Sequence, residues 1–210
     1  MDKKDSFIKK LKVEQTERVY QGRLFSFVVE DITLPNDSKT KMAMVRHPGS
    51  AAIVPLREDG NVVMIHQYRH PVRDFLLEIP AGTIEPGESP LDCARRELME
   101  ETGLKAKEFI KLTEVHILPA YSDEKIHVYL ARKFTSMKQR LDQDEILEVV
   151  EYPFGEVVDM IGSGVATNAL TMLSIQMAWR YLQKNDLLDK NKLLPAGLSE
   201  VFDGLGKSNI

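Results

Sequence analysis

The sequence lacks the features that mark a disulfide scaffold, a membrane protein or a nucleic-acid binder. Its 210 residues include one cysteine, Cys93, so no disulfide forms within the chain, which is typical of a reducing compartment. No stretch approaches the roughly 18 consecutive apolar residues typical of a transmembrane helix. The net charge of −4 disfavours broad electrostatic contact with nucleic acid. These absences predict a cytoplasmic protein with no membrane or nucleic-acid partner.

The composition is that of an ordinary globular protein. Hydrophobic residues make up 43% of the chain and charged residues 29%, enough for a substantial core. The length fits one domain, or one domain with an added subdomain.

The first 47 residues predict a small antiparallel sheet. Short β-rich runs occur at residues 18–20, 24–29 and 41–45, separated by good turn residues at 21–22 and 35–38. Three strands bury little surface alone, so we expect this sheet to pack on its own domain or on a second copy of the chain.

The remainder predicts a larger domain, residues 48–190, followed by a tail, residues 191–210. We expect strands at 51–56 and 62–68, joined as a hairpin by the turn 58–61, and a further strand at 75–79. A helix at 89–103, strands at 110–118, 126–134 and 146–152, and helices at 154–161 and 167–183 follow. This order predicts an α+β fold with a mixed sheet between helices.

One helix carries an acidic edge that its own electrostatics disfavour. Glu97, Glu100 and Glu101 lie on one side of it and repel one another. The helix is otherwise well delimited, with a capping box starting at Ser89 and a C-terminal Gly103. A hard divalent cation such as Mg²⁺, which binds carboxylate oxygens, would relieve the repulsion.

Residues 82–104 match the Nudix box, G-x5-E-x7-R-E-U-x-E-E-x-G-U with U a bulky aliphatic residue, at every defined position. These positions are Gly82, Glu88, Arg96, Glu97, Leu98, Glu100, Glu101, Gly103 and Leu104. The resemblance implies a Nudix α/β/α sandwich and hydrolysis of a nucleoside diphosphate linked to another moiety, dependent on Mg²⁺ with Mn²⁺ as a substitute. The alternative is a solvated acidic helix face that binds nothing.

Cleaving a diphosphate requires neutralising charge on phosphoryl oxygens and orienting a water in line with the leaving group. We expect Glu97, Glu101 and Glu100 to hold metal. Arg96 is expected to orient a carboxylate by a bidentate contact rather than to bind phosphate. Gly82 would let the chain bend, so that the carbonyl of Ala81 serves as a further ligand, as in similar enzymes.

The sequence flanking the box resembles ADP-ribose pyrophosphatases and related nucleotide-sugar hydrolases. The segment 119–124, PAYSDE, is similar to the subgroup's P-G-[FY]-[ST]-[DS]-E loop, whose glutamate is thought to activate the water. The resemblance therefore implies that Glu124 is the general base, against the alternative of exposed polar surface. Ala120 departs from the pattern, since glycine is common there, which puts the bending of the loop in doubt.

The same resemblance assigns one substrate contact: Arg69 is expected to bind the diphosphate. Arg46 and Glu78 are weaker candidates, against a role in ordinary ion pairs. Phe25 or Tyr20 would stack on a nucleobase, although an aromatic residue in a strand more often belongs to the core. The subgroup's habit also implies a homodimer.

Three functions remain open at this point. The first is Mg²⁺-dependent hydrolysis of ADP-ribose or a related nucleoside diphosphate sugar to a nucleoside monophosphate and a sugar phosphate. The second is another Nudix substrate, such as a dinucleoside polyphosphate, coenzyme A or an oxidised nucleotide. The third is a non-catalytic sensor that binds ADP-ribose; such sensors often lose box carboxylates, whereas this chain keeps them.

Overall fold

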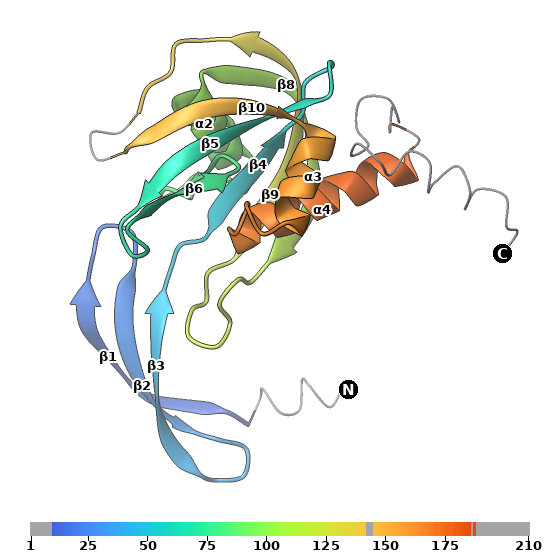
Figure 1. Ribbon diagram of the computed structural model, residues 1–210. Coiled ribbons are helices and arrows are strands. Elements are labelled where there is room, and N and C mark those ends of the chain that lie inside the picture. Colours follow the sequence, from blue (N-terminus) through green and yellow to red (C-terminus); the bar gives the residue numbers. More distant parts are fainter. Residues whose placement is uncertain (1–9, 142–144, 186, 188–210) are drawn as a thin grey trace, which may run out of the picture. The chain divides into compact units, whose positions relative to one another are not determined.

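The computed structural model describes residues 10–141, 145–185 and 187 (Figure 1). The chain forms two compact units: Met1–Gly49 with His116–Lys125, and Ser50–Val115 with Ile126–Ile210. The predicted tail, residues 191–210, lies outside the described residues. Within the described ranges, no helix combines the length and the apolar character needed to cross a membrane.

The first unit contains a three-stranded antiparallel sheet in the order β1-β2-β3. Its strands are β1 (Lys12–Gln21), β2 (Ser26–Thr33) and β3 (Lys39–Arg46). The central strand β2 alternates buried with half-buried residues, whereas every residue of β1 is exposed. The predicted N-terminal antiparallel sheet is confirmed. Its strands are longer than predicted because the ladder continues through polar residues of low β propensity.

The second unit contains two sheets, ordered β7-β4-β9-β8 and β10-β5-β6. The first is mixed because β4 and β9 run parallel, while its other pairs are antiparallel. The strands are β4 (Ser50–Pro55), β5 (Asn61–Arg69), β6 (Asp74–Glu78), β7 (Ala81–Thr83), β8 (Leu104–Val115), β9 (Ile126–Ser136) and β10 (Leu147–Pro153).

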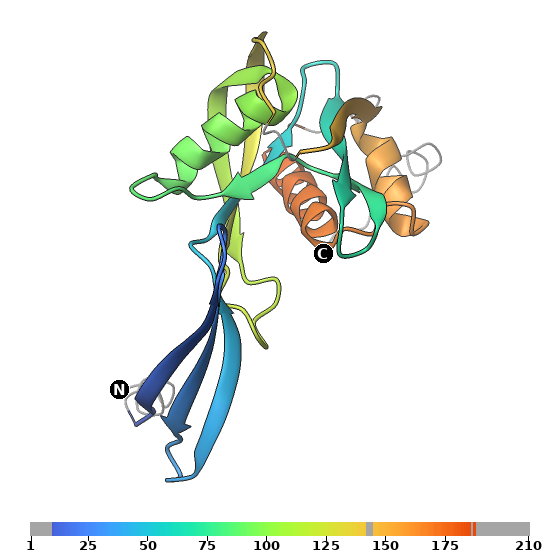
Figure 2. The ribbon, with the colours of Figure 1, turned by 90° about the vertical axis from the view of Figure 1, so that its left-hand side faces the viewer.

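Three helices cover these sheets: α2 (Pro90–Thr102), α3 (Phe154–Gly162) and α4 (Ala169–Lys184). Helix α2 packs against β4, β7 and β8, and α4 packs against β4, β8 and β6. In Figure 2, α2 (green) and α4 (orange-red) lie on opposite sides of the β7-β4-β9-β8 sheet. The predicted α+β fold with a mixed sheet between helices is confirmed.

The core lies where α2 meets this sheet. Ala51 and Ile53 of β4, together with Cys93, Ala94 and Leu98 of α2, are completely buried in one cluster. Cys93 is thus a packing residue, and burial raises the pKa of its thiol to about 12. The core therefore fixes the inner face of the helix that carries the acidic edge.

The predicted hairpin of residues 51–68 is wrong. A turn does form, since the N–H of Gly60 donates to the carbonyl of Arg57 (3.1 Å), and one bridge joins Leu56 to Val62. Beyond it, β4 pairs with β7 and β9, whereas β5 pairs with β6 and β10. Both strands are central and largely buried; β5 pairs with the next strand, β6, on one side and with the distant β10 on the other, while both partners of β4 are distant in sequence.

Two further details differ from expectation. Residues 81–83, which follow the predicted strand 75–79, form β7, in which Ala81 lies opposite Ala52 of β4. The sequence pattern predicts one apolar face of α4 at Leu170, Leu173, Met177 and Leu182. Leu182 is buried and the other three are half-buried, while the remaining buried side chains are Thr171, Ser174, Ile175 and Ala178. The helix packs closely through its smaller residues, and the hydroxyl of Thr171 accepts the Ile79 N–H (3.1 Å).

Candidate active site

Helix α2 is positioned by caps at both ends. The Ser89 hydroxyl accepts the Asp92 N–H (3.2 Å), and Gly103 closes the helix in a left-handed conformation (φ 67°) with its N–H on the carbonyl of Met99. Between these caps, Glu97 and Glu101 fall on the buried face, beside the core residues. Two of the predicted metal ligands are therefore packed into the fold rather than exposed on a solvated edge.

Arg96 lies at the centre of the carboxylate cluster. Its guanidinium forms a bidentate pair with Glu88, Nε to Oε1 and Nη2 to Oε2, both at 3.0 Å. Its Nη1 donates to Glu97 (2.6 Å) and to Glu100 (3.1 Å), and Nη2 also reaches the carbonyl of Thr83 in β7 (3.0 Å). The contact with Glu88 is the bidentate carboxylate contact that the sequence analysis favoured for this arginine. One side chain thus links α2, the preceding loop and β7.

The charges in the cluster shift one another's pKa values. Arg96 lowers the pKa of Glu88, and Glu88 in turn raises that of Arg96. Glu97 behaves differently because burial is the larger effect: it raises the pKa to about 7, although the Arg96 guanidinium opposes this.

Glu101 is the most deeply placed carboxylate of α2, at 1% exposed. Burial raises the pKa of Glu101 well above its ordinary value, and the charges of Glu97 and Glu145 add to this. Opposing them, the N–H of Ala81 donates to Oε2 of Glu101 (3.0 Å). A buried carboxylate beside another is unfavourable unless a cation compensates it.

Gly82 leaves room for the Glu97 carboxylate. A Cβ built at Gly82 would overlap the Oε1 and Cδ atoms of Glu97. Gly82 lies in β7 rather than in a loop, and it is not among the glycines with positive φ in the described residues, so its predicted role in bending the chain stays a prediction. The glycine of the motif is needed for close approach of strand and helix.

The cluster suits a hard divalent cation by its donor chemistry, since its side chains offer carboxylate oxygens only. The described residues nevertheless contain no group of three or more His, Cys, Asp or Glu side chains arranged around one point as metal ligands. Glu97 and Glu100 are instead turned onto Arg96. The role of the Ala81 carbonyl stays a prediction; the structure shows only the N–H of that residue, on Glu101.

Arg69 and Glu78 pair with each other across β5 and β6. Nε of Arg69 lies 3.0 Å from Oε1 of Glu78, and Nη2 lies 2.6 Å from Oε2. The hydrogen bond to Glu78 raises the pKa of Arg69. The Glu78 side chain is 4% exposed and that of Arg69 is 43% exposed. The buried carboxylate therefore fixes the position of a side chain that is partly accessible to solvent.

The other three predicted residues, Arg46, Phe25 and Glu124, lie in the first unit. Arg46 donates to Glu30 (2.6 Å) and to Asp123 (2.9 Å). Phe25 precedes β2, is exposed, and has its ring centroid 6.3 Å from that of Tyr20.

Ala120 stands where the loop pattern commonly has glycine. Within the described part of the chain, the non-glycine residues with positive φ are Asp37, Arg73 and Lys133, so the backbone at Ala120 does not require glycine.

Several partners of these residues were not predicted from the sequence. Thr83 contributes only its carbonyl, which leaves no signal in the sequence. Glu30, which binds Arg46, matches no motif. Asp123 occupies the [DS] position of the loop pattern, but the pattern does not indicate that Arg46 is its partner. Nδ1 of His47 lies 3.6 Å from the carboxylate Oε1 of Glu124. The two residues are far apart in sequence, so only the tertiary structure brings them together.

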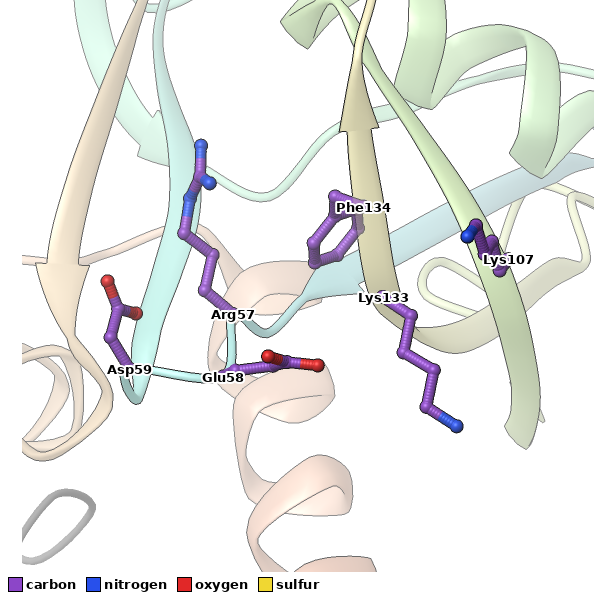
Figure 3. A pocket seen from close by; sticks show the side chains of 6 residues that line it. All are labelled: Arg57, Glu58, Asp59, Lys107, Lys133 and Phe134. Carbon is purple, nitrogen blue, oxygen red and sulfur yellow. The ribbon is translucent and has the colours of Figure 1, made fainter.

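A pocket of about 530 Å³ lies elsewhere in the second unit (Figure 3). It is lined by Arg57, Glu58, Asp59, Lys107, Lys133 and Phe134. Two of its cations are already in ion pairs, Arg57 with Glu151 (2.7 Å) and Lys133 with Glu108 (3.5 Å). Because none of the predicted site residues lines this pocket, it is not the candidate active site.

A model of the NUDIX domain matches residues 46–169 of the chain, which include the cluster on α2. The chain belongs to the NUDIX family. It is 36% identical over 178 residues to an ADP-ribose pyrophosphatase of Bacillus subtilis (strain 168), covering 84% of this chain and 94% of the relative. It is 34% identical over 179 residues to the methanol dehydrogenase activator of Bacillus methanolicus, covering 84% and 95%.

Other NUDIX relatives extend this comparison. A GDP-mannose pyrophosphatase of Yersinia enterocolitica is 35% identical over 159 residues, covering 69% of this chain and 83% of the relative. A crystal structure of an ADP compounds hydrolase superposes with a TM-score of 0.74 over 84% of this chain and 96% of its own, at 23% identity. The solved structure supports the fold, and the family model identifies a NUDIX hydrolase, a class that generally uses a divalent metal.

We predict that Gly82→Ala disables the NUDIX helix. The added methyl group must displace the Glu97 carboxylate or separate β7 from α2, which costs about 1–3 kcal/mol of stability as overpacking. Thermal melting and hydrolase activity should both fall. The matched control is Gly162→Ala at the end of α3, where an added Cβ meets no atom within 4 Å. Equal behaviour of the two variants would contradict this account of Gly82.

Proposed function

We propose that this NUDIX hydrolase cleaves the diphosphate bond of ADP-ribose or a related nucleoside diphosphate sugar, releasing a nucleoside monophosphate and a sugar phosphate. The observation that carries the proposal is the cluster of four glutamates around Arg96 and Ala81, two of them buried. Relatives named ADP-ribose pyrophosphatase and GDP-mannose pyrophosphatase support this class of substrate.

In this proposal Glu97, Glu100 and Glu101, with the carbonyl of Ala81, hold Mg²⁺, for which Mn²⁺ can substitute. When bound, the ion neutralises the charge that develops on the phosphoryl oxygens. Arg96 holds Glu97 and Glu100 on one guanidinium, and Glu88 keeps Arg96 in place through its bidentate pair. The burial of Glu97 and Glu101, which raises the pKa of both, supports this assignment, because a cation would stabilise buried carboxylates in their charged form.

Arg69 is the proposed diphosphate contact. Its bidentate pair with the buried Glu78 fixes the guanidinium plane while leaving part of the side chain at the surface. Arg46 is the weaker candidate, because Glu30 and Asp123 already share its charge. Phe25 remains a candidate for stacking on a nucleobase, and its exposure beside Tyr20 favours that role over one in the core.

The decisive experiment for the substrate class is a turnover panel. ADP-ribose, ADP-glucose, GDP-mannose and a dinucleoside polyphosphate are each incubated with the protein and Mg²⁺, and the phosphomonoester products are quantified by release of phosphate with phosphatase. We expect turnover of nucleoside diphosphate sugars above that of the dinucleoside polyphosphate, and loss of turnover with excess chelator. Turnover that survives chelation would refute the metal assignment.

A regulatory role is the competing proposal, and the relative named methanol dehydrogenase activator is the observation that favours it. A sensor of ADP-ribose would bind the nucleotide sugar without consuming it. Binding by calorimetry, combined with no turnover of any compound in the panel, would establish the sensor and exclude the hydrolase. The complete set of box carboxylates favours the hydrolase.

Glu124 is the proposed general base, which takes the proton from the attacking water. We predict that Glu124→Gln lowers kcat by about 10²–10⁴-fold, the usual contribution of a general base, while the affinities for Mg²⁺ and substrate stay close to wild type. Steady-state kinetics and calorimetry measure the two effects. A variant that retains most of the wild-type kcat would move the base to another carboxylate.

We also propose a homodimer that covers the N-terminal sheet. Large apolar side chains are exposed there, including Val13, Val19, Tyr20 and Met42, and a solvated sheet with such side chains is a typical protein–protein interface. Light scattering at micromolar concentration should give twice the mass of one chain, and Val19→Asp should shift it toward the monomer. A monomer mass for the wild type would contradict the proposal.

A further inference from the structure

The loop of residues 116–125 is joined to β3 by backbone hydrogen bonds. The N–H of Val45 donates to the carbonyl of Tyr121 (2.8 Å), and the N–H of Asp123 donates to the carbonyl of Val45 (3.2 Å). Val45 and Ser122 thereby form an isolated parallel bridge. Two bonds are a weak attachment by themselves, because a pair of strands this short is only marginally stable.

The side chain of Asp123 reinforces this attachment. Its Oδ1 accepts the N–H of His47 (2.9 Å), and its Oδ2 accepts from Nη1 of Arg46 (2.9 Å). Both carboxylate oxygens thus bind the two residues that follow Val45. Burial raises the pKa of Asp123, but the His47 N–H and the Arg46 guanidinium outweigh it and hold the pKa below the usual value.

Arg46 is itself fixed from the other side. Its Nη2 lies 2.6 Å from Oε1 of Glu30, a buried residue of the central strand β2. A chain of contacts, which we call the clamp, therefore runs from Glu30 through Arg46 to Asp123, and its far end lies on a buried residue of the sheet. Charged hydrogen bonds of this kind are stronger than neutral ones.

Glu124, the residue after Asp123, lies next to the same segment. Its Oε1 is 3.6 Å from Nδ1 of His47, and that Nδ1 accepts the N–H of Gly49 (3.1 Å). The backbone of Glu124 is held on both sides, by Ser122 Oγ at its N–H (3.2 Å) and by His116 at its carbonyl (3.1 Å).

We propose that Asp123 is a positioning residue, which clamps the loop to Arg46 and His47 and so fixes Glu124 beside His47. This inference rests on the proposed function of Glu124 as the base. Placement matters because an error of about 1 Å in a reacting group can cost roughly 10²-fold in rate.

Two substitutions separate the parts of the clamp. Asp123→Asn keeps an oxygen for the His47 N–H but loses the ion pair with Arg46, whereas Asp123→Ala loses both. We expect kcat to fall about tenfold in the first and about 10²-fold in the second, with KM within about twofold of wild type. Asp31→Asn is the matched control: it breaks the Lys41–Asp31 ion pair (2.6 Å) in the same sheet without touching the loop.

A double-mutant cycle distinguishes positioning from general stabilisation. If Asp123 acts only through Glu124, adding Asp123→Ala to Glu124→Gln lowers kcat no further. The inference would be overturned if the loss of kcat in the double variant equalled the product of the losses in the two single variants. An Asp123→Ala variant with wild-type kcat would also overturn it.

Amide hydrogen exchange tests the clamp without substrate. Exchange at residues 119–124 should be faster in Asp123→Ala than in wild type or Asp31→Asn, and Asp123→Asn should give an intermediate rate. If the alanine variant does not fold, Asp123→Asn provides the comparison with wild type. Unchanged exchange in both Asp123 variants refutes the clamp. If the wild type hydrolyses nothing in the panel while exchange behaves as expected, the proposed function fails and the clamp stands.

Discussion

The constraint on which the second unit depends is negative charge packed into the inner face of α2. Glu97 and Glu101 share that face with Cys93, Ala94 and Leu98, which are core residues. Burying one carboxylate is costly, and burying two as neighbours is more so. The surrounding groups act against this cost, because the guanidinium of Arg96 and the N–H of Ala81 are both directed at these carboxylates.

Arg96 and Gly82 solve complementary parts of this problem. A lysine in place of Arg96 has a single compact ammonium, so it lacks the planar fork that contacts Glu88, Glu97, Glu100 and the Thr83 carbonyl together. Gly82 removes the one atom that would occupy the position of the Glu97 carboxylate. Arg96 supplies charge and Gly82 supplies space. Replacing Arg96 by lysine and replacing Gly82 by alanine would therefore disturb the carboxylate cluster for different reasons.

Features of the fold that depend on neighbouring residues were predictable from the sequence. Both ends of α2 follow from Ser89, Pro90 and Gly103, whose effects act within one turn. Strand pairing was not predictable in the same way. The turn before Asn61 forms, yet β4 and β5 enter different sheets: β4 pairs with β9 and β5 with β10, and each of these partners is separated from its strand by a long stretch of sequence. A continuous apolar run identifies a buried strand without identifying its neighbours.

The same distinction applies within the candidate site. The partners of Arg96 lie within 13 residues of it in sequence, so a motif of fixed spacing can encode the whole cluster. The Arg46–Asp123 contact joins residues 77 positions apart, and no fixed spacing represents it. The carboxylate cluster can therefore be inferred from the box alone. The loop pattern identifies Glu124 but not its placement, which depends on how residues 45–47 at the end of β3 meet a segment more than 70 residues away in sequence.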